Sequence, residues 1–263
     1  MNGRRIRALI LASQPRGFGA YCLPAIAAAA GIEVAAVIEC EGVATRPWLR
    51  RWRKLQKIAR IGVLGALQGV RMRRWYDLAE RLAVEPLESV AARHGIPFHR
   101  TASTFSASTS AIARAAAADI GLSLGNGYIP ERLFSVPRLG MINVHHELLP
   151  EFKGAQSVIW QLYHGSTKTG FTIHRIDRRI DGGAILYREA MPVRLQATLE
   201  ATVRESYAML WEASRDALVR LLPDVEAQLA AASPQGPGRT FTTPSYWQFR
   251  RIARAHARLA AGR

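Results

Sequence analysis

Cysteine is scarce in this 263-residue sequence, which contains only Cys22 and Cys40. Two cysteines are too few for a disulfide scaffold or a cysteine-rich zinc site, and each is expected to be buried as a small apolar residue. The chain also lacks any run of about 18 consecutive apolar residues, so no transmembrane helix is expected. These absences favour a globular protein of the reducing cytoplasm.

Acidic residues are missing from two long segments, although acids are present elsewhere and the formal net charge is +16. Residues 42–76 contain ten Lys and Arg and no acid, and the chain after Glu226 contains six Arg and no acid. These two segments account for the whole positive excess. A uniformly basic chain would indicate nucleic-acid binding, whereas this distribution indicates an ordinary domain with two added basic surfaces.

The first predicted turn lacks one glycine of the dinucleotide-binding fingerprint. Its sequence, SQPRGFGAYC, supplies Gly17 and Gly19, but Cys22 stands where the third glycine should be. That glycine normally allows the helix to pack closely on the strand. The fingerprint is therefore treated as absent.

The elements that are present predict an α/β fold. Continuous apolar runs at 5–13 and 32–39 are typical of strands buried on both faces, and a helix is expected between them at 19–30. The alternation continues, with helices expected at 86–95, 108–118, 156–165, 199–222 and 245–260, and strands at 96–99, 119–124, 140–146, 169–176 and 184–193. This order predicts a Rossmann-like, doubly wound, mostly parallel sheet with right-handed crossovers.

Polar and titratable side chains gather where the strand at 140–146 ends. Side chains alternate along a strand, so Asn143 and His145 point the same way. They lie at the carboxyl edge, where open α/β sheets build their sites. An amide donor beside an imidazole suits a reaction that generates an oxyanion and moves a proton near neutral pH. Asp181 supplies the carboxylate, and the two glycines after it let the backbone approach a ligand closely.

These residues lie in two stretches that resemble the catalytic domain of the folate-dependent formyltransferases. NVHHELLPEFKGAQSVIWQLYHG matches the family pattern N-x-H-x-S-L-L-P and a following Gly, and TGFTIHRIDRRIDGGAIL matches its T-G-x-T and D-x-G. The family includes the glycinamide ribonucleotide, methionyl-tRNA and sugar N-formyltransferases. The resemblance implies a catalytic domain at 1–223 with a basic helical insertion at 46–76, then a linker and a basic C-terminal helix at 224–263.

The resemblance also implies roles for individual residues. Asn143 would hydrogen-bond the formyl oxygen as it becomes an oxyanion. His145 would stabilise that oxyanion or help the acceptor amine to lose its proton, and Asp181 would orient His145 and relay protons. No metal ion and no covalent enzyme intermediate is implied. The pterin of the donor, 10-formyltetrahydrofolate, is expected beside four residues: Gly127, Tyr128, Ile129 and Asp177.

The chain departs from the family pattern directly after the predicted catalytic histidine. The family has a small residue and then Ser, whereas this chain has His146 and Glu147. These two are expected either to contact the acceptor amine or to lie at the rim of the site. His174, in an alternating strand, is expected to be structural or solvent-facing. Three further histidines are scattered without the spacing of metal ligands: His94, His99 and His164.

The acceptor is the least constrained part of the interpretation. The first turn matches the phosphate cradle of the glycinamide ribonucleotide enzymes only at Gly17 and Gly19. About 40 residues follow the long helix, too few for the C-terminal barrel of the methionyl-tRNA enzymes. The expected acceptor is a primary amine of a small molecule: a nucleotide-linked or lipid-linked amino sugar, or another specialised metabolite. Two alternatives stay open, namely hydrolysis of formyltetrahydrofolate and an RNA- or membrane-binding protein built on a formyltransferase core.

The basic insertion at 46–76 has three interpretations. Trp48, Trp52, Leu55 and Ile58 follow a helical spacing with Arg and Lys between them. In the first, the segment is a solvated helix that packs its tryptophans onto the domain. In the second, it is a membrane-surface helix. In the third, it is a lid that binds the phosphates of a nucleotide-linked acceptor or of RNA. The second interpretation implies peripheral association with anionic membranes. The C-terminal helix would extend the same surface, and a homodimer through that helix is one open arrangement.

Overall fold

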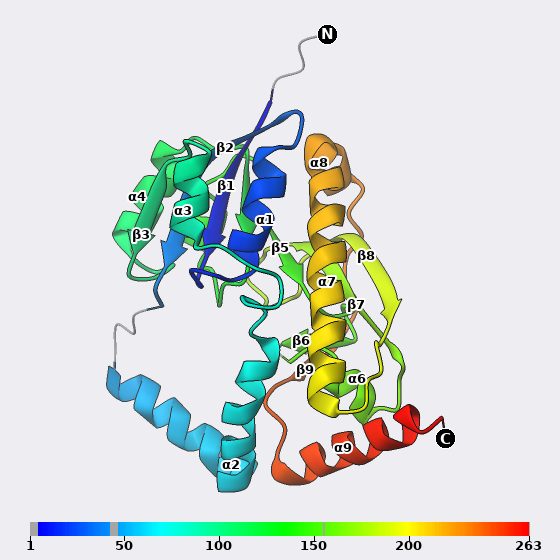
Figure 1. Ribbon diagram of the computed structural model, residues 1–263. Helices are drawn as coiled ribbons and strands as arrows, with labels where there is room; N and C mark the ends of the chain where they lie inside the picture. Colours follow the sequence, from blue (N-terminus) through cyan, green and yellow to red (C-terminus); the bar gives the residue numbers. More distant parts are fainter. Residues whose placement is uncertain (1–4, 43–46, 155, 263) are drawn as a thin grey trace.

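The computed structural model describes residues 5–42, 47–154 and 156–262. A seven-stranded sheet of order β3-β2-β1-β4-β5-β7-β8 forms its centre (Figure 1). Five strands are parallel: β1 (Ile6–Ala12), β2 (Ile32–Cys40), β3 (Phe98–Thr101), β4 (Ile120–Ser123) and β5 (Met141–His145). Two follow in antiparallel pairing: β7 (Lys168–Arg175) and β8 (Ile185–Pro192). The predicted Rossmann-like, mostly parallel sheet is confirmed.

Helices cover both faces of this sheet because its central strands are apolar on both sides. Along β1, Ala8 and Ile10 belong to one buried cluster, whereas Leu9 and Leu11 belong to the other. The first cluster includes residues of α1 (Phe18–Ala27), α3 (Leu87–Arg93), α6 (Ile159–Tyr163) and α7 (Leu199–Leu221). The second includes residues of α4 (Ala107–Ala115) and α5 (Glu131–Phe134). Cys22 and Cys40 are free and buried, as predicted.

Some elements differ from those expected. The helix predicted at 156–165 is only five residues long, Ile159–Tyr163, because Gln156 and Val158 have positive φ of 76° and 74°. A small parallel pair, β6 (Phe152–Gly154) with β9 (Arg239–Phe241), was not predicted. Strands of three residues are too short to show a hydrophobic period. The 3₁₀ turns Arg74–Tyr76 and Leu222–Asp224 and the helix α8 (Val225–Ala230) complete the element order.

The basic insertion forms the helix α2 (Pro47–Arg73), which is broken at Gly62. Gly62 has φ 77° and ψ 163°, a conformation open essentially to glycine alone, so the two arms diverge there. Helix is confirmed for the described part of the insertion; Arg46 lies outside the described residues. Trp48 and Trp52 are 65% and 55% exposed, so the interpretation that they pack onto the domain is wrong.

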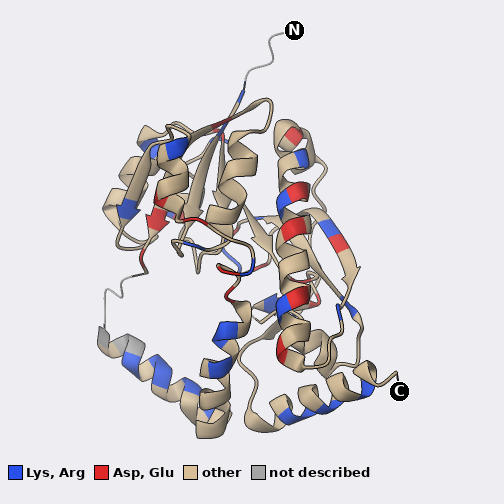
Figure 2. Cartoon of the chain, in the orientation of Figure 1, with Lys and Arg blue, Asp and Glu red and all other residues tan. Residues whose placement is uncertain are grey.

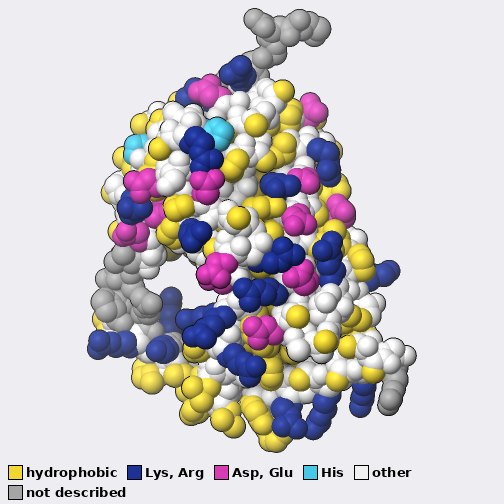
Figure 3. Space-filling view, in the orientation of Figure 1, with side chains coloured by type: hydrophobic (Ala, Val, Ile, Leu, Met, Phe, Trp, Pro, Cys, Tyr) yellow, Lys and Arg dark blue, Asp and Glu magenta, His cyan; other side chains and the backbone are white. Residues whose placement is uncertain are grey.

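The C-terminal helix α9 (Tyr246–Ala260) lies beside the second arm of α2 (Figure 1). Its Ser245 cap and Gln248 form a capping box, and its Ile252 is fully buried in the first core cluster. Lys and Arg recur along both helices (Figure 2), and apolar side chains gather on the surface near the bend of α2 (Figure 3). Among the described residues, no helix is long and apolar enough to span a membrane.

The T-G-x-T stretch of β7 holds the loop that follows β5. The Thr172 hydroxyl donates to the carbonyl of Glu147 at 2.8 Å and accepts from the amide of Leu149 at 3.1 Å. At Gly170, a Cβ atom would overlap the carbonyl of Glu189 and the side chain of Leu148. The threonine therefore clamps the loop, and the glycine leaves room for it to lie on the strand.

We predict that Gly170→Ala lowers the free energy of unfolding by about 1–3 kcal/mol, because the added methyl has no space between β8 and Leu148. Denaturation in urea measures this change. Gly236→Ala is the matched control, since its Cβ would meet no heavy atom within 4 Å. Equal denaturation midpoints for Gly170→Ala and the parent would contradict the prediction.

Candidate active site

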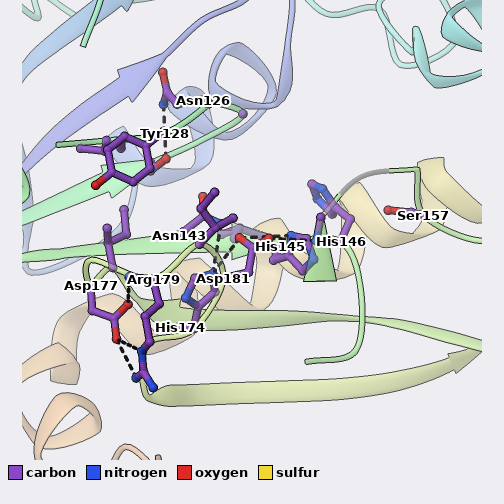
Figure 4. A pocket seen from close by; sticks show the side chains of 18 of the residues that line it. Asn126, Tyr128, Asn143, His145, His146, Ser157, His174, Asp177, Arg179 and Asp181 are labelled. Carbon is purple, nitrogen blue, oxygen red and sulfur yellow. Dashed lines mark hydrogen bonds and ion pairs between the residues drawn. The ribbon is translucent and has the colours of Figure 1, made fainter. Parts of the chain in front are cut away.

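A cavity of about 390 Å³ lies at the carboxyl ends of β4 and β5 (Figure 4). It is lined by all three predicted catalytic residues, Asn143, His145 and Asp181. It is also lined by the four residues predicted to contact folate: Gly127, Tyr128, Ile129 and Asp177. The structure therefore brings together segments that are far apart in the sequence, while the roles of these residues stay predictions.

Asn143 is held by His174, a residue whose part in the site was not predicted. The two lie opposite each other in the β5–β7 pairing, and Asn143 Nδ2 lies 3.2 Å from His174 Nε2. His174 Nδ1 donates to the carbonyl of Arg175 at 2.9 Å. In the neutral ring Nε2 must then accept from Asn143. This contact uses one hydrogen of the Asn143 amide and leaves the second for a ligand.

Burial keeps His174 in the neutral form that this contact requires. The ring is almost fully buried, so of the two expectations for His174, a structural role or exposure to solvent, exposure is wrong. Burial lowers the pKa of His174 to about 4, and the neighbouring His145 acts in the same direction. The strand alternation was the signal that could have found it, because His174 shares a face of β7 with Thr172.

His145 lies between a carbonyl and a carboxylate. Its Nε2 donates to the carbonyl of Phe152 at 3.1 Å, so in the neutral ring Nδ1 carries a lone pair. Nδ1 lies 3.9 Å from Asp181 Oδ1. A proton taken up at Nδ1 would thus form an imidazolium beside a counter-ion. The arrangement suits a histidine that accepts a proton during the reaction.

Asp181 is fixed by the backbone of β6. Its Oδ2 accepts from the amide of Gly154 at 3.0 Å, and its Oδ1 lies 3.9 Å from His174 Nε2. Asp181 has a positive φ of 48°, which Asp tolerates more readily than most residues. The following glycines were expected to approach a ligand. Instead, Gly183 packs against the carbonyl of Arg175 and Gly182 against the side chain of Arg179, so they shape the protein itself.

His146 and Glu147 are buried, so the expectation that they lie at the rim is wrong. His146 lines the inner wall of the cavity, where its Nε2 lies 3.2 Å from the Ser214 hydroxyl and its ring meets Phe18 edge-on at 4.6 Å. Burial, with His145 acting in the same direction, lowers the pKa of His146 to about 3. Its contact with an acceptor amine stays a prediction.

Glu147 faces away from the cavity. It is not among the lining residues, and its Oε2 accepts from the amide of Gln161. Burial raises the pKa of Glu147 to about 8, although the hydrogen bond from Gln161 acts in the opposite direction. The geometry therefore gives no support to the predicted contact of Glu147 with the acceptor.

The remaining walls of the cavity contribute a side-chain amide and an ion pair. Asn126 Nδ2 donates to the carbonyl of Leu11 at 2.6 Å, which orients the amide, and Asn126 Oδ1 is buried with no hydrogen-bond partner. Across the cavity, Arg179 forms an ion pair with Asp177 at 2.8 Å (Figure 4). Asn126 and Arg179 were not predicted. Within the described ranges, no group of three or more His, Cys, Asp or Glu could hold a metal ion.

We predict that stability falls as the pH drops below about 6.5, the unfolded pKa of histidine. Because the folded pKa of His174 is lowered to about 4, the unfolded chain binds this proton first. His174→Gln keeps an acceptor for Asn143 and removes the titration. As the pH falls from 6 to 4.5, the free energy of unfolding should decrease less for His174→Gln than for the parent. The difference between the two slopes should be about 1.4 kcal/mol per pH unit.

Urea denaturation at several pH values measures these slopes. His146 adds to the slope of the parent and Glu147 opposes it, so the difference between His174→Gln and the parent isolates His174. His94→Gln, at an exposed position, is the control for replacing a histidine by glutamine. Parallel curves for His174→Gln and the parent would show that this histidine titrates alike in both states.

Known proteins resemble this chain in sequence over its central part. The family model described as formyl transferase matches residues 72–220. The methionyl-tRNA formyltransferase of Thermosynechococcus vestitus is 33% identical over 135 residues, which are 49% of this chain and 41% of that protein. The enzyme of the same name from Halorhodospira halophila is 32% identical over 156 residues, 59% of this chain and 49% of that protein. The chain spans about half the length of these curated relatives.

Solved structures share the fold at lower identity. Glycinamide ribonucleotide transformylase 1 of Symbiobacterium toebii aligns with a TM-score of 0.56 at 20% identity, covering 85% of this chain and 90% of that one. A 4-N formyltransferase of Francisella tularensis aligns with a TM-score of 0.56 at 13% identity, covering 94% and 79%. The family match spans more than half of the chain and contains the predicted catalytic residues Asn143, His145 and Asp181. The chain belongs to the formyl transferase family.

Proposed function

We propose that this protein transfers a formyl group from 10-formyltetrahydrofolate to a primary amine of a phosphate-linked amino sugar. The observation that carries the transfer is the convergence of Asn143, His145 and Asp181 on one cavity, with a free amide hydrogen and an imidazole lone pair. Two further features, one on each side of these residues, support the donor and the acceptor.

The donor side of the cavity fits a pterin. The buried Oδ1 of Asn126 has no partner in the protein and would accept an N–H group of the ring. Ile129 and Ile176 supply apolar lining, and Tyr128 stacks on Phe105 with ring centroids 6.1 Å apart. One solved relative in fold, a sugar 3N-formyl transferase, was crystallised with dTDP and 5-N-formyltetrahydrofolate; it covers 90% of this chain and 70% of that one, with a TM-score of 0.54 at 15% identity. In this chain, 10-formyltetrahydrofolate bound on this side would supply the formyl group.

The residues of this chain then move charge and a proton. As the amine attacks the formyl carbon, the second Nδ2 hydrogen of Asn143 donates to the formyl oxygen, which gains negative charge. His145 Nδ1 accepts the proton of the amine, and Asp181 at 3.9 Å stabilises the imidazolium. When the carbon–nitrogen bond to the donor breaks, the imidazolium returns that proton to the leaving nitrogen.

A second cavity of about 960 Å³ supports a phosphate-linked acceptor. It shares Gln156 with the first cavity, and the buried Oε1 of Gln156 has no partner. Its lining contains four arginines: Arg16, Arg73, Arg74 and Arg204. Across the described part of the chain, the last three make no side-chain hydrogen bond or ion pair, although Asp77, Glu80 and Glu200 also line the cavity. Guanidinium groups suit phosphate oxygens because they donate two parallel hydrogen bonds.

A second candidate acceptor is the aminoacyl end of methionyl-tRNA. The observation that favours it is the name of the curated relatives, methionyl-tRNA formyltransferase. The phosphates of a tRNA would use the same arginines. The two candidates therefore differ in what they place beside Gln156, a sugar amine or the amine of a methionyl ester.

One assay tests the proposal and its rivals. The protein is incubated with 10-formyltetrahydrofolate in three parallel reactions: one without any amine, one with nucleotide-linked amino sugars and one with methionyl-tRNA. Tetrahydrofolate release and the mass of the acceptor are followed in each. Release together with a formylated amino sugar supports the proposal. If methionyl-tRNA is the one acceptor that becomes formylated, the acceptor is the tRNA and not an amino sugar. If tetrahydrofolate is released equally with and without an amine, the protein is a hydrolase.

We predict that Asn143→Ala lowers kcat by about 100- to 1000-fold, because it removes a hydrogen-bond donor to the developing oxyanion. Steady-state kinetics with a formylated acceptor measures the loss. Arg114→Ala, on the exposed side of α4, is the control and should keep the kcat of the parent. A kcat for Asn143→Ala within a small factor of the parent would remove Asn143 from the reaction.

We predict that Arg74→Gln with Arg204→Gln raises KM for a phosphate-linked acceptor by about tenfold or more, because two charge-assisted hydrogen bonds are lost. The KM for 10-formyltetrahydrofolate should not change, since neither arginine lines the first cavity. A soluble amino sugar without phosphate, compared in the same assay, should be insensitive to the substitutions. Unchanged KM for the phosphate-linked acceptor would exclude the second cavity as its site.

A further inference from the structure

Exposed large apolar side chains are concentrated on α2 and α9. Of the eleven such residues among those described, eight lie on these two helices. The other three belong to the mouth of the active-site cavity: Tyr128 and Ile180 line it, and Phe105 stacks on Tyr128. The apolar residues of α2 and α9 therefore have no assigned ligand, and a patch of this kind marks an interaction site.

The apolar residues of α2 form one stripe on each arm. Trp48, Trp52 and Leu55 recur at the i, i+4 and i+7 positions of the first arm, and all three are exposed. On the second arm the stripe is formed by Val63, Leu64, Leu67 and Val70. The break at Gly62 joins the arms at an angle, so the second stripe begins directly at the bend.

The second arm turns its small residues inward and its large ones outward. A Cβ on Gly65 would lie 3.2 Å from the amide nitrogen of Tyr246, and a Cβ on Gly69 would lie 2.7 Å from Thr243 Cγ2. This contact orients Leu64 and Leu67, 57% and 62% exposed, away from the domain. It also brings the bend close to Trp247, which is 75% exposed and adjoins Tyr246. The apolar side chains at the bend form one patch (Figure 3).

Basic residues border this patch, and acids are absent from both segments. Arg250, Arg254 and Arg258 are exposed and recur at four-residue spacing on α9. Figure 2 shows basic residues along this helix, and Figure 3 shows basic side chains beside the apolar ones. Neither residues 42–76 nor the chain after Glu226 contains an Asp or Glu. A ligand for this surface must therefore offer negative charge next to apolar material.

We infer that the exposed stripes of α2, Trp247 and the α9 arginines form a surface that docks on an anionic lipid membrane. Tryptophan and aliphatic residues flanked by Arg and Lys on helices that lie along a surface are the features of in-plane membrane binding. Tryptophan suits both a nucleic acid base and an acyl chain, whereas the Leu and Val residues of the stripes suit acyl chains and offer no ring for a base to stack on. The inference does not depend on the proposed reaction.

The second arm connects this surface with the arginine-lined cavity. It runs from the bend at Gly62 to Arg73, about 16 Å at 1.5 Å per residue. Arg73 and the following Arg74 line that cavity. Docking through the bend therefore holds the second cavity within about 16 Å of the lipid headgroups.

Vesicle flotation and tryptophan quenching test the docking. Three of the six tryptophans lie on the surface, and Trp75, Trp160 and Trp211 are buried. We expect flotation with vesicles that contain roughly one third phosphatidylglycerol, and at least tenfold less with pure phosphatidylcholine. Brominated acyl chains should quench part of the tryptophan fluorescence on binding. Equal flotation with both vesicles, or flotation with neither, would overturn the inference.

Paired variants separate the contribution of the basic residues to membrane binding from that of the apolar residues. Arg254→Glu with Arg258→Glu should weaken binding by about 30-fold or more, since each basic residue near such a surface contributes about fivefold. Arg93→Glu with Arg114→Glu makes the same charge change on exposed positions of α3 and α4 and should bind like the parent. Leu64→Glu with Leu67→Glu should abolish quenching. Circular dichroism confirms folding, which these exposed positions leave intact.

Other occupants give different results. If a second copy of the chain covers the stripes, Leu64→Glu with Leu67→Glu converts a dimer into a monomer in light scattering while flotation stays unchanged. If RNA is the ligand, polyuridylate binds with the same sensitivity to Arg254→Glu and Arg258→Glu, and brominated lipids quench nothing. Either result would overturn the membrane inference.

Discussion

The antiparallel pairing of β5 with β7 is the constraint on which the site depends. In this register Asn143 lies opposite His174, and His145 lies opposite Thr172. The first pair orients the amide that faces the cavity, and Thr172 clamps the loop after β5 through Glu147 and Leu149. The chain that leaves β7 then returns Asp181 to within 3.9 Å of both His145 and His174. The reversal from β5 to β7 thus assembles four polar residues that line the cavity: Asn143, His145, His174 and Asp181.

Burial decides the protonation states within this arrangement. His174 and His146 stay neutral because their buried surroundings disfavour the charged ring. Burial likewise disfavours the charged carboxylate of Glu147 and raises its pKa to about 8. A neutral His174 can accept from Asn143, so the charge that develops during a reaction is confined to the cavity that contains His145 and Asp181. Desolvation of the supporting residues is in this way part of the chemistry of the site.

Much of the fold and part of the site were predictable because local patterns specify them. Apolar runs and their alternation with helices predicted the sheet, and the period of two along β5 placed Asn143 and His145 on one face. The D-x-G match singled out Asp181. The inward position of His174 was predictable only in principle, since a period of two fits either face of β7 until its partner strand is known. The β6–β9 pair joins segments 87 residues apart and left no local signal.

The sequence by itself indicated the family, the mostly parallel sheet, the predicted catalytic residues Asn143, His145 and Asp181, and the two basic segments, because each is recognisable from neighbouring residues. Tertiary structure alone decided which side chains the trio meets: His174 rather than solvent beside Asn143, and Gln161 rather than a ligand beside Glu147. It also decided that Leu64 and Leu67 of α2 face outward, because Gly65 and Gly69 occupy the side that packs against the start of α9. Such choices depend on contacts between distant segments, and those contacts exist only once the sheet has formed.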